Sequence, residues 1–168
     1  MESYIISVLV HNQPGVLSRV SGLFSRRGFN IESLAVGTTH VEGISRMTIV
    51  VPGTLRTVEQ MAAQIRKLMC VTLVKILPAG NVIAREMLLI KVRCGKENRD
   101  AVARIVDIFR ARIVDVNRNC MTVEITGEEK KNAAFLELMG DFGILEIVRT
   151  GTVALEQGEG YLRAASEE

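Results

Sequence analysis

Apolar residues in the first eighty positions alternate between a strand-like and a helix-like spacing. The run from Tyr4 to Val10 is rich in Ile and Val, which favours a strand. From Val16 the apolar positions recur three and four residues apart, as on one helix face, and Gly28 stands where a C′ glycine ends a helix. The same criteria predict strands over 29–36 and 47–51, a helix over 55–69 with Thr54 as its N-cap, and a strand over 71–77.

The second half of the chain repeats this order of elements without repeating the residues. Its hydrophobic pattern predicts a strand over 86–94, a helix over 98–110, strands over 113–116 and 121–126, a helix over 128–139, and a strand over 144–148 that extends toward 155. In the last of these helices the residues expected to face the core are Phe135, Leu138 and Met139. The tail from about 158 is polar and is expected to fray.

Two successive β-α-β-β-α-β units predict an α+β protein of two tandem ferredoxin-like sandwiches. Each would hold a four-stranded antiparallel sheet with two helices on one face. Since residues 79–85 separate the two patterns, the predicted domains are 1–79 and 80–168. Such sheets leave a face or an edge strand that needs cover, so we expect pairing between subunits and an oligomer.

Composition and charge exclude several classes of function. A net charge of +2 over 168 residues is too small to predict binding to nucleic acid or to an acidic membrane. The three cysteines are widely spaced without a CxxC pair, and the two histidines have no partners at ligand spacing, so no metal site and no catalytic residue is predicted. With no signal peptide and no membrane-length apolar run, the expected location is the cytoplasm.

The segment His11-Asn12-Gln13-Pro14-Gly15 lies between the first strand and the first helix. Free backbone N–H groups at the start of a helix form a ready site for a carboxylate, and an Asn side chain offers both a donor and an acceptor to an α-amino acid. The apolar residues Val16 and Leu17 would suit an aliphatic side chain. The alternative is a plain turn in which Asn, Pro and Gly serve only the backbone. The residues alone favour this plain turn, because short turn motifs often occur without any ligand.

Longer segments carry a resemblance to a known family. The chain resembles the ACT domain of acetolactate synthase small subunits at NQPGVLSRV (12–20), LFSRRGFNIESL (23–34) and SRMTIVV (45–51), and their C-terminal domain at REMLLIKV (85–92) and FRARIVDV (109–116). An ACT domain in general shares only the strand–(D/N)xPG–helix opening. The longer segments are similar to this one family over nearly the whole chain.

The resemblance implies a binding site for a feedback inhibitor, usually valine, between two ACT domains of a homodimer. Asn12, Gly15, Val16 and Leu17 would form one side of that site. Asn30 and Ile31, on the following strand of the second subunit, would form the other.

The same resemblance implies a regulatory role without catalysis. The partner would be a separate large catalytic subunit that carries thiamine diphosphate, Mg²⁺ and FAD, with no cofactor on this chain. The first domain would sense the effector and the second would activate the large subunit. The alternatives are a free-standing ACT regulator of another enzyme and a small acylphosphatase-like hydrolase, which would need an Arg-bearing phosphate loop where this chain has Asn-Gln-Pro-Gly.

Overall fold

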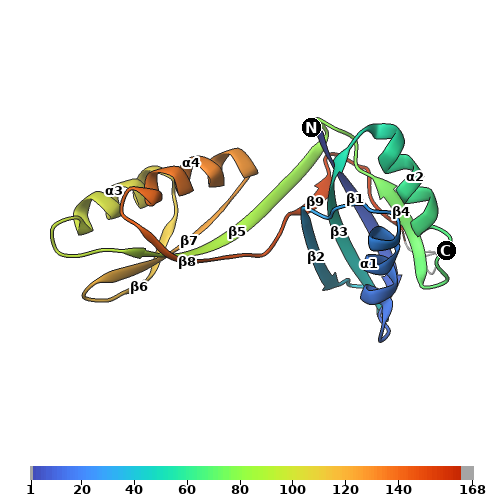
Figure 1. Cartoon of the computed structure of the whole chain (residues 1–168), viewed down its shortest axis with the longest axis horizontal. Helices are drawn as coiled ribbons and strands as arrows, with labels where there is room; N and C mark the ends of the chain where they lie inside the picture. Colours follow the sequence, from blue (N-terminus) through green and yellow to red (C-terminus); the bar gives the residue numbers. More distant parts are fainter. Residues whose placement is uncertain (1, 164–168) are drawn as a thin grey trace. The chain divides into compact units, whose positions relative to one another are not determined.

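The computed structural model describes residues 2–163 and divides the chain into two compact units. Unit 1 comprises residues 1–83 together with 152–168, and unit 2 comprises residues 84–151. No helix within the described residues has the length and hydropathy to cross a bilayer. Each unit has two helices on one face of an antiparallel sheet (Figure 1), which confirms the predicted α+β class.

Unit 1 forms a four-stranded sheet in the order β2-β3-β1-β4, with every neighbouring pair antiparallel. Its elements are β1 (Glu2–His11), α1 (Val16–Arg26), β2 (Ser33–Thr38), β3 (Ile44–Gly53), α2 (Leu55–Ile65) and β4 (Val71–Ile76). The predicted cap of α2 is confirmed, because the hydroxyl of Thr54 accepts a hydrogen bond from the backbone N–H of Thr57.

Unit 2 has the equivalent strand order, β6-β7-β5-β8. Its elements are β5 (Val82–Arg93), α3 (Arg99–Ile108), β6 (Arg112–Val116), β7 (Cys120–Gly127), α4 (Glu129–Gly140) and β8 (Ile144–Arg149). A short further strand, β9 (Val153–Glu156), also pairs with β5. The first residues of β5 belong to unit 1, so this strand leads from one unit into the other.

Alternate strand residues and one face of each helix build the two cores. In unit 1 the fully buried residues include Ile6 and Val8 of β1, Ile49 of β3 and Phe24 of α1. In unit 2 the aromatic rings of Phe109 and Phe135 pack edge to face with centroids 5.3 Å apart. These cores hold each sheet against its helices and fix where each turn lies.

Two predictions about local structure are wrong. The second strand begins at Ser33 rather than at residue 29. The chain first has to end α1, with Gly28 at a φ of +68° and the N–H of Phe29 donating to Phe24 O at 3.0 Å. In α4, Leu138 is 40% exposed, and Asn132 is buried instead because its Nδ2 donates to Glu86 O at 3.0 Å.

The compact units differ from the predicted domains at the C-terminal side. Residues 152–163, which we call the C-terminal segment, belong to unit 1 rather than to the second domain, and the boundary near β5 lies at 83/84 instead of 79/80. The expected fraying from about 158 does not describe the first residues of that tail, because Leu162 packs with Leu9 and Ile44. Residues 164–168 lie outside the described residues.

The C-terminal segment covers the face of the first sheet that the helices leave open. In β3, Met47, Ile49 and Val51 face the helices, so the alternate residues face the opposite side. Three polar contacts join the segment to that sheet: Thr152 N–H donates to Ser33 Oγ at 2.8 Å, Arg46 Nη2 donates to Ala154 O at 2.7 Å, and Lys75 pairs with Glu156. Beneath the segment, Ser7 and Thr48 are buried although they are polar.

Candidate functional site

The turn between β1 and α1 is held by backbone hydrogen bonds to the residues that directly precede β3 and β4. The N–H of His11 donates to Cys70 O at 2.9 Å, and the N–H of Asn12 donates to Gly43 O at 2.7 Å. Neither Gly43 nor Cys70 was predicted to belong to the site, because each contributes only a carbonyl group that any residue could supply. They fix the position from which residues 12–15 project.

Gly15 is the N-cap of α1 and needs to be glycine for its backbone conformation. Its φ of +82° and ψ of −3° lie in the left-handed region, where a side chain would be strained. A Cβ built at Gly15 would have no atom within 4 Å, so crowding is not the reason for glycine here. The same open space leaves the first turn of α1 accessible to a ligand.

The start of α1 has unused hydrogen-bond donors and no acidic side chain. Among residues 2–163, no acceptor lies within bonding distance of the N–H groups of Leu17 and Ser18, whereas the N–H of Arg19 donates to Gly15 O at 3.0 Å. The first turn has no Asp or Glu and no side-chain cap. The positive end of the helix dipole is therefore exposed to solvent, an arrangement that attracts a carboxylate.

The side chains predicted around this turn differ in their exposure. Asn12 is exposed, and Leu17 is 47% exposed beside the helix start. Val16 is only 4% exposed because its side chain packs into the core of unit 1. Asn12 and Leu17 can therefore meet a ligand with their side chains, whereas Val16 offers its backbone.

Asn30 and Ile31 lie at the opposite end of α1 from the turn. Both precede β2, so they occupy a loop rather than the strand that was predicted for them. Asn30 is exposed, and Ile31 is partly buried against the core. Since the eleven residues of α1 rise about 16 Å, one chain does not bring these two residues to the turn.

The described residues offer no arrangement typical of catalysis at the turn. Within residues 2–163, no three His, Cys, Asp or Glu side chains are close enough together to hold a metal ion. Burial lowers the pKa of Arg46. The pKa of Tyr4 is raised by the hydrogen bond that the Tyr4 hydroxyl donates to Glu2. Neither residue belongs to the turn of residues 12–17. What the turn can do chemically is bind an anion through backbone donors.

Comparison with known proteins shows the family to which the chain is similar. Residues 6–72 match the family model of the AHAS small subunit-like ACT domain, and residues 85–158 match that of the small subunit of acetolactate synthase. A protein of Archaeoglobus fulgidus described as a probable acetolactate synthase small subunit is 50% identical over 155 residues, covering 92% of this chain and 97% of its own length.

Two further relatives extend the comparison. The acetolactate synthase small subunit of Mycobacterium leprae is 48% identical over 158 residues, covering 94% of each protein. The crystal structure of the acetolactate synthase small subunit from Thermotoga maritima is 41% identical with a TM-score of 0.89, and the match covers 95% of this chain and 100% of that one. This chain, with its N-terminal ACT domain, therefore belongs to the family of acetolactate synthase small subunits.

Proposed function

We propose that this chain confers feedback regulation on a separate acetolactate synthase catalytic subunit by binding a branched-chain amino acid, with valine as the first candidate. The observation that carries the proposal is the exposed start of α1, where N–H donors meet no acceptor among residues 2–163 and the first turn has no acidic side chain. The alternative of a plain turn explains the φ of Gly15 and would leave these donors to water, as at other helix starts, so the two interpretations differ in whether an amino acid binds there.

Each part of an α-amino acid has a matching group at the turn. The carboxylate would accept hydrogen bonds from the N–H groups of Leu17 and Ser18, helped by the helix dipole. The ammonium group would donate to the amide oxygen of Asn12, which is exposed. An aliphatic side chain would cover the exposed side of Leu17. A branched aliphatic amino acid satisfies all three groups together.

A homodimer would complete this site. Asn30 and Ile31 lie at the far end of α1, so they can reach the turn only from a second subunit whose α1 runs in the opposite direction. β2 is an edge strand of the first sheet and Val36 on it is 49% exposed. Edge-to-edge pairing of two such sheets about a two-fold axis would place each loop beside the other subunit's turn.

The chain would act on its catalytic partner through a change in its own arrangement. Thiamine diphosphate, Mg²⁺ and FAD belong to that partner in this proposal, and both proteins would share the cytoplasm. The second domain would raise the partner's activity when no effector is bound, and effector binding to the first would oppose this. Coupling of this kind is typically about 1–3 kcal/mol.

The test is a reconstitution with the catalytic subunit. Acetolactate formation is measured with and without this chain while valine is titrated, using wild type, Asn12→Ala and the control Gln13→Ala. Gln13 is exposed in the same turn but is given no role in binding. We expect activation by all three proteins and about tenfold weaker inhibition by valine with Asn12→Ala alone, which corresponds to the loss of one hydrogen bond to a charged group.

Two results would contradict the proposal. If the chain neither co-elutes with the catalytic subunit nor changes its rate, a free-standing regulator of another enzyme becomes the better explanation. If valine inhibits the Asn12→Ala and wild-type complexes at the same concentration, the effector site lies elsewhere.

A further inference from the structure

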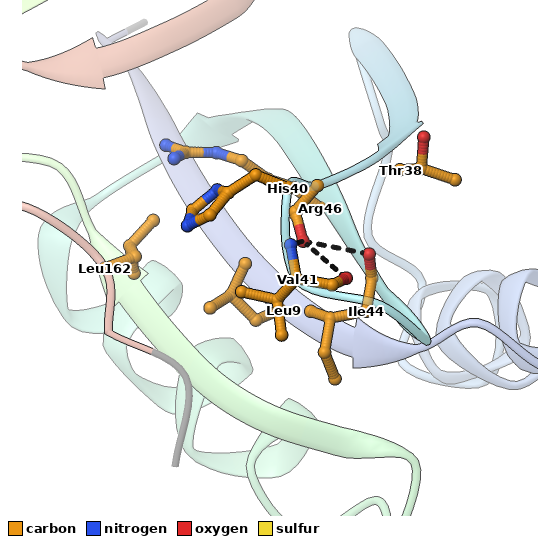
Figure 2. Close-up of a pocket in the computed structure, with 8 residues that line it drawn as sticks. Leu9, Thr38, His40, Val41, Ile44, Arg46 and Leu162 are labelled. Atoms are coloured by element: carbon orange, nitrogen blue, oxygen red, sulfur yellow. Dashed lines mark hydrogen bonds between the residues drawn. The ribbon is translucent and has the colours of Figure 1, made fainter. Parts of the chain in front are cut away.

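A pocket lies on the face of the first sheet that is opposite to α1 and α2. Its volume is about 250 Å³, and it is roofed in part by the C-terminal segment. The residues that line it are Leu9, Thr38, Thr39, His40, Val41, Ile44, Arg46 and Leu162 (Figure 2). All of them belong to unit 1, and none belongs to the turn of residues 12–17.

The lining divides into an apolar part and a cationic part. Leu9 and Ile44 are buried and pack against Val41 and Leu162, so they form one apolar surface. Figure 2 shows His40 and Arg46 extending in the same direction beside it. A neighbouring pocket of about 360 Å³ shares His40, Arg46 and Leu162 with this one. Its lining also includes Lys75 and Glu156, which form an ion pair with each other.

Arg46 is the group most suited to recognising an anion here. Its side chain is half-buried, and burial lowers its pKa because desolvation disfavours the charged form. The guanidinium has five N–H donors, and within the described residues one hydrogen bond accounts for it, from Nη2 to Ala154 O. The remaining donors suit a carboxylate, which guanidinium binds in a bidentate manner.

The size and chemistry of the pocket select among anions. A volume of about 250 Å³ corresponds to roughly eight water molecules, which is the size of a short aliphatic acid. The lining of this pocket includes no Asp or Glu among the described residues, so no carboxylate of the lining would pair with an ammonium group. We propose that this pocket is a second small-molecule site, which binds a short aliphatic monocarboxylate without an amino group, with its carboxylate on Arg46 and its alkyl chain against Leu9, Ile44 and Leu162.

The pocket shares a tight turn with the candidate effector site. The hydroxyl of Thr39 lies 3.2 Å from Val41 O and 3.0 Å from Ile44 O, and the N–H of Ile44 donates to Val41 O at 3.2 Å. In the same turn Gly43 O accepts the N–H of Asn12 at 2.7 Å. A ligand that displaces Val41 or Ile44 therefore moves the group that holds Asn12, and the two sites are linked through residues 39–44.

The test uses 4-methylpentanoate as the probe and 4-methylpentanamide as its uncharged match, added to the full chain with labelled methyl groups. We expect the acid to shift the methyl signals of Ile44 and Leu162 along one saturation curve, and the backbone amide signal of Asn12 to move with them. The amide should bind about tenfold more weakly, because it lacks the charge that Arg46 recognises. Valine should shift Leu17 directly, and any shift that it transmits to Ile44 should follow the saturation curve of Leu17 rather than that of the acid.

Two variants separate this site from the effector turn. Arg46→Met removes the charge at similar length, and Val41→Phe fills the pocket while Arg46 remains; each should weaken binding of the acid by about tenfold or more. Asn12→Ala should leave it unchanged. Shifts confined to Leu17, equal binding of acid and amide, or no shift at Ile44 would overturn the proposal. Because valine is followed at Leu17 in the same samples, failure of the proposed function is seen separately.

Discussion

The first strand of each unit ends in equivalent backbone contacts, yet only one of the two helix starts that follow is suited to a ligand. In unit 1 the N–H of Asn12 donates to Gly43 O at 2.7 Å, and in unit 2 the N–H of Cys94 donates to Asn119 O at 2.9 Å. A register shift also occurs at the equivalent place in β1 and in β5. The backbone frame at the two strand ends is therefore shared, whereas the helix caps differ, since Gly15 has a φ of +82° and Asn98 a φ of −119°.

The side chains on this shared frame differ in ways that decide the chemistry. Asn12 is exposed, whereas Cys94 in the equivalent position is fully buried. The first turn of α1 has no acidic residue, whereas that of α3 contains Asp100, which already satisfies the positive end of its helix dipole. The comparison teaches that the fold supplies a helix start in both units, and that local side chains determine whether it stays open.

The C-terminal segment distinguishes unit 1 from unit 2, and its removal has the largest expected effect on stability. A chain that ends at Gly151 should lose about 3 kcal/mol in the unfolding free energy of unit 1, because Leu9 and Ile44 lose apolar cover and the contacts of Arg46 and Ser33 are broken. Hydrogen exchange should place the loss in unit 1 and leave unit 2 protected.

The matched control for this truncation is a chain that ends at Gln157, which retains β9 and the three polar contacts and should lose less stability. Equal stability of the two shortened chains would contradict the role of the segment. A chain that ends at Gly80 would not isolate the first domain, because it also lacks the C-terminal segment that belongs to unit 1.

The next effect concerns the backbone of the effector turn. Gly15→Ala and Gly80→Ala each place a Cβ on a glycine with nearly the same φ, +82° and +81°, and with open space around it. Each should lower the unfolding free energy by about 1 kcal/mol. Calorimetry with valine should show weaker binding for the Gly15 variant only. A similar loss of affinity in both would mean that stability, rather than the turn, controls binding.

A stabilising change of similar size is available in unit 2. Arg110 has a φ of +53° and occupies the position after α3 that Gly28 occupies after α1, since Ala111 N–H donates to Val106 O at 2.9 Å as Phe29 N–H does to Phe24 O. Arg110→Gly should therefore raise the unfolding free energy by about 1 kcal/mol in urea unfolding. The reciprocal Gly28→Arg should lower it, and no change in either variant would contradict the comparison.

The substitution with the smallest expected effect on stability is one that makes the start of α1 resemble that of α3. Ser18→Glu adds an acidic side chain to the first turn of α1 and should stabilise the unit by about 0.3–1 kcal/mol through the helix dipole. The same carboxylate should compete with the ligand and weaken valine binding. Ser18→Gln, which has the same shape without the charge, is the control in both measurements, and equal behaviour of the two variants would argue against an anion site.

Much of this architecture follows from hydrophobic spacing and cap residues. The spacing located the four helices and eight of the nine described strands, and Thr54 and Gly28 marked helix ends for reasons that a sequence displays. β9 escaped prediction as a separate strand because its pairing with β5 joins distant parts of the chain, and its residues were expected to extend β8.

The candidate site was predictable only in part. Gly15 and the polar turn are visible in the sequence, because a left-handed N-cap and a free helix start require particular residues. The burial of Val16 depends on how α1 meets the core, and the carbonyl groups of Gly43 and Cys70 belong to the backbone, so neither leaves a signal in the residue types. The pocket behind the sheet depends on the C-terminal segment, whose position only the structure shows.

The most direct test of the effector site compares valine with valinol, in which a hydroxymethyl group replaces the carboxylate. Calorimetry on the full chain, with the methyl signals of Leu17 followed in parallel, measures whether the start of α1 holds that carboxylate. We predict saturable binding of valine that shifts Leu17, and binding of valinol weaker by about a hundredfold, because the helix start then lacks its anion. Equal affinities for the two ligands, or binding that leaves Leu17 unchanged, would contradict the account.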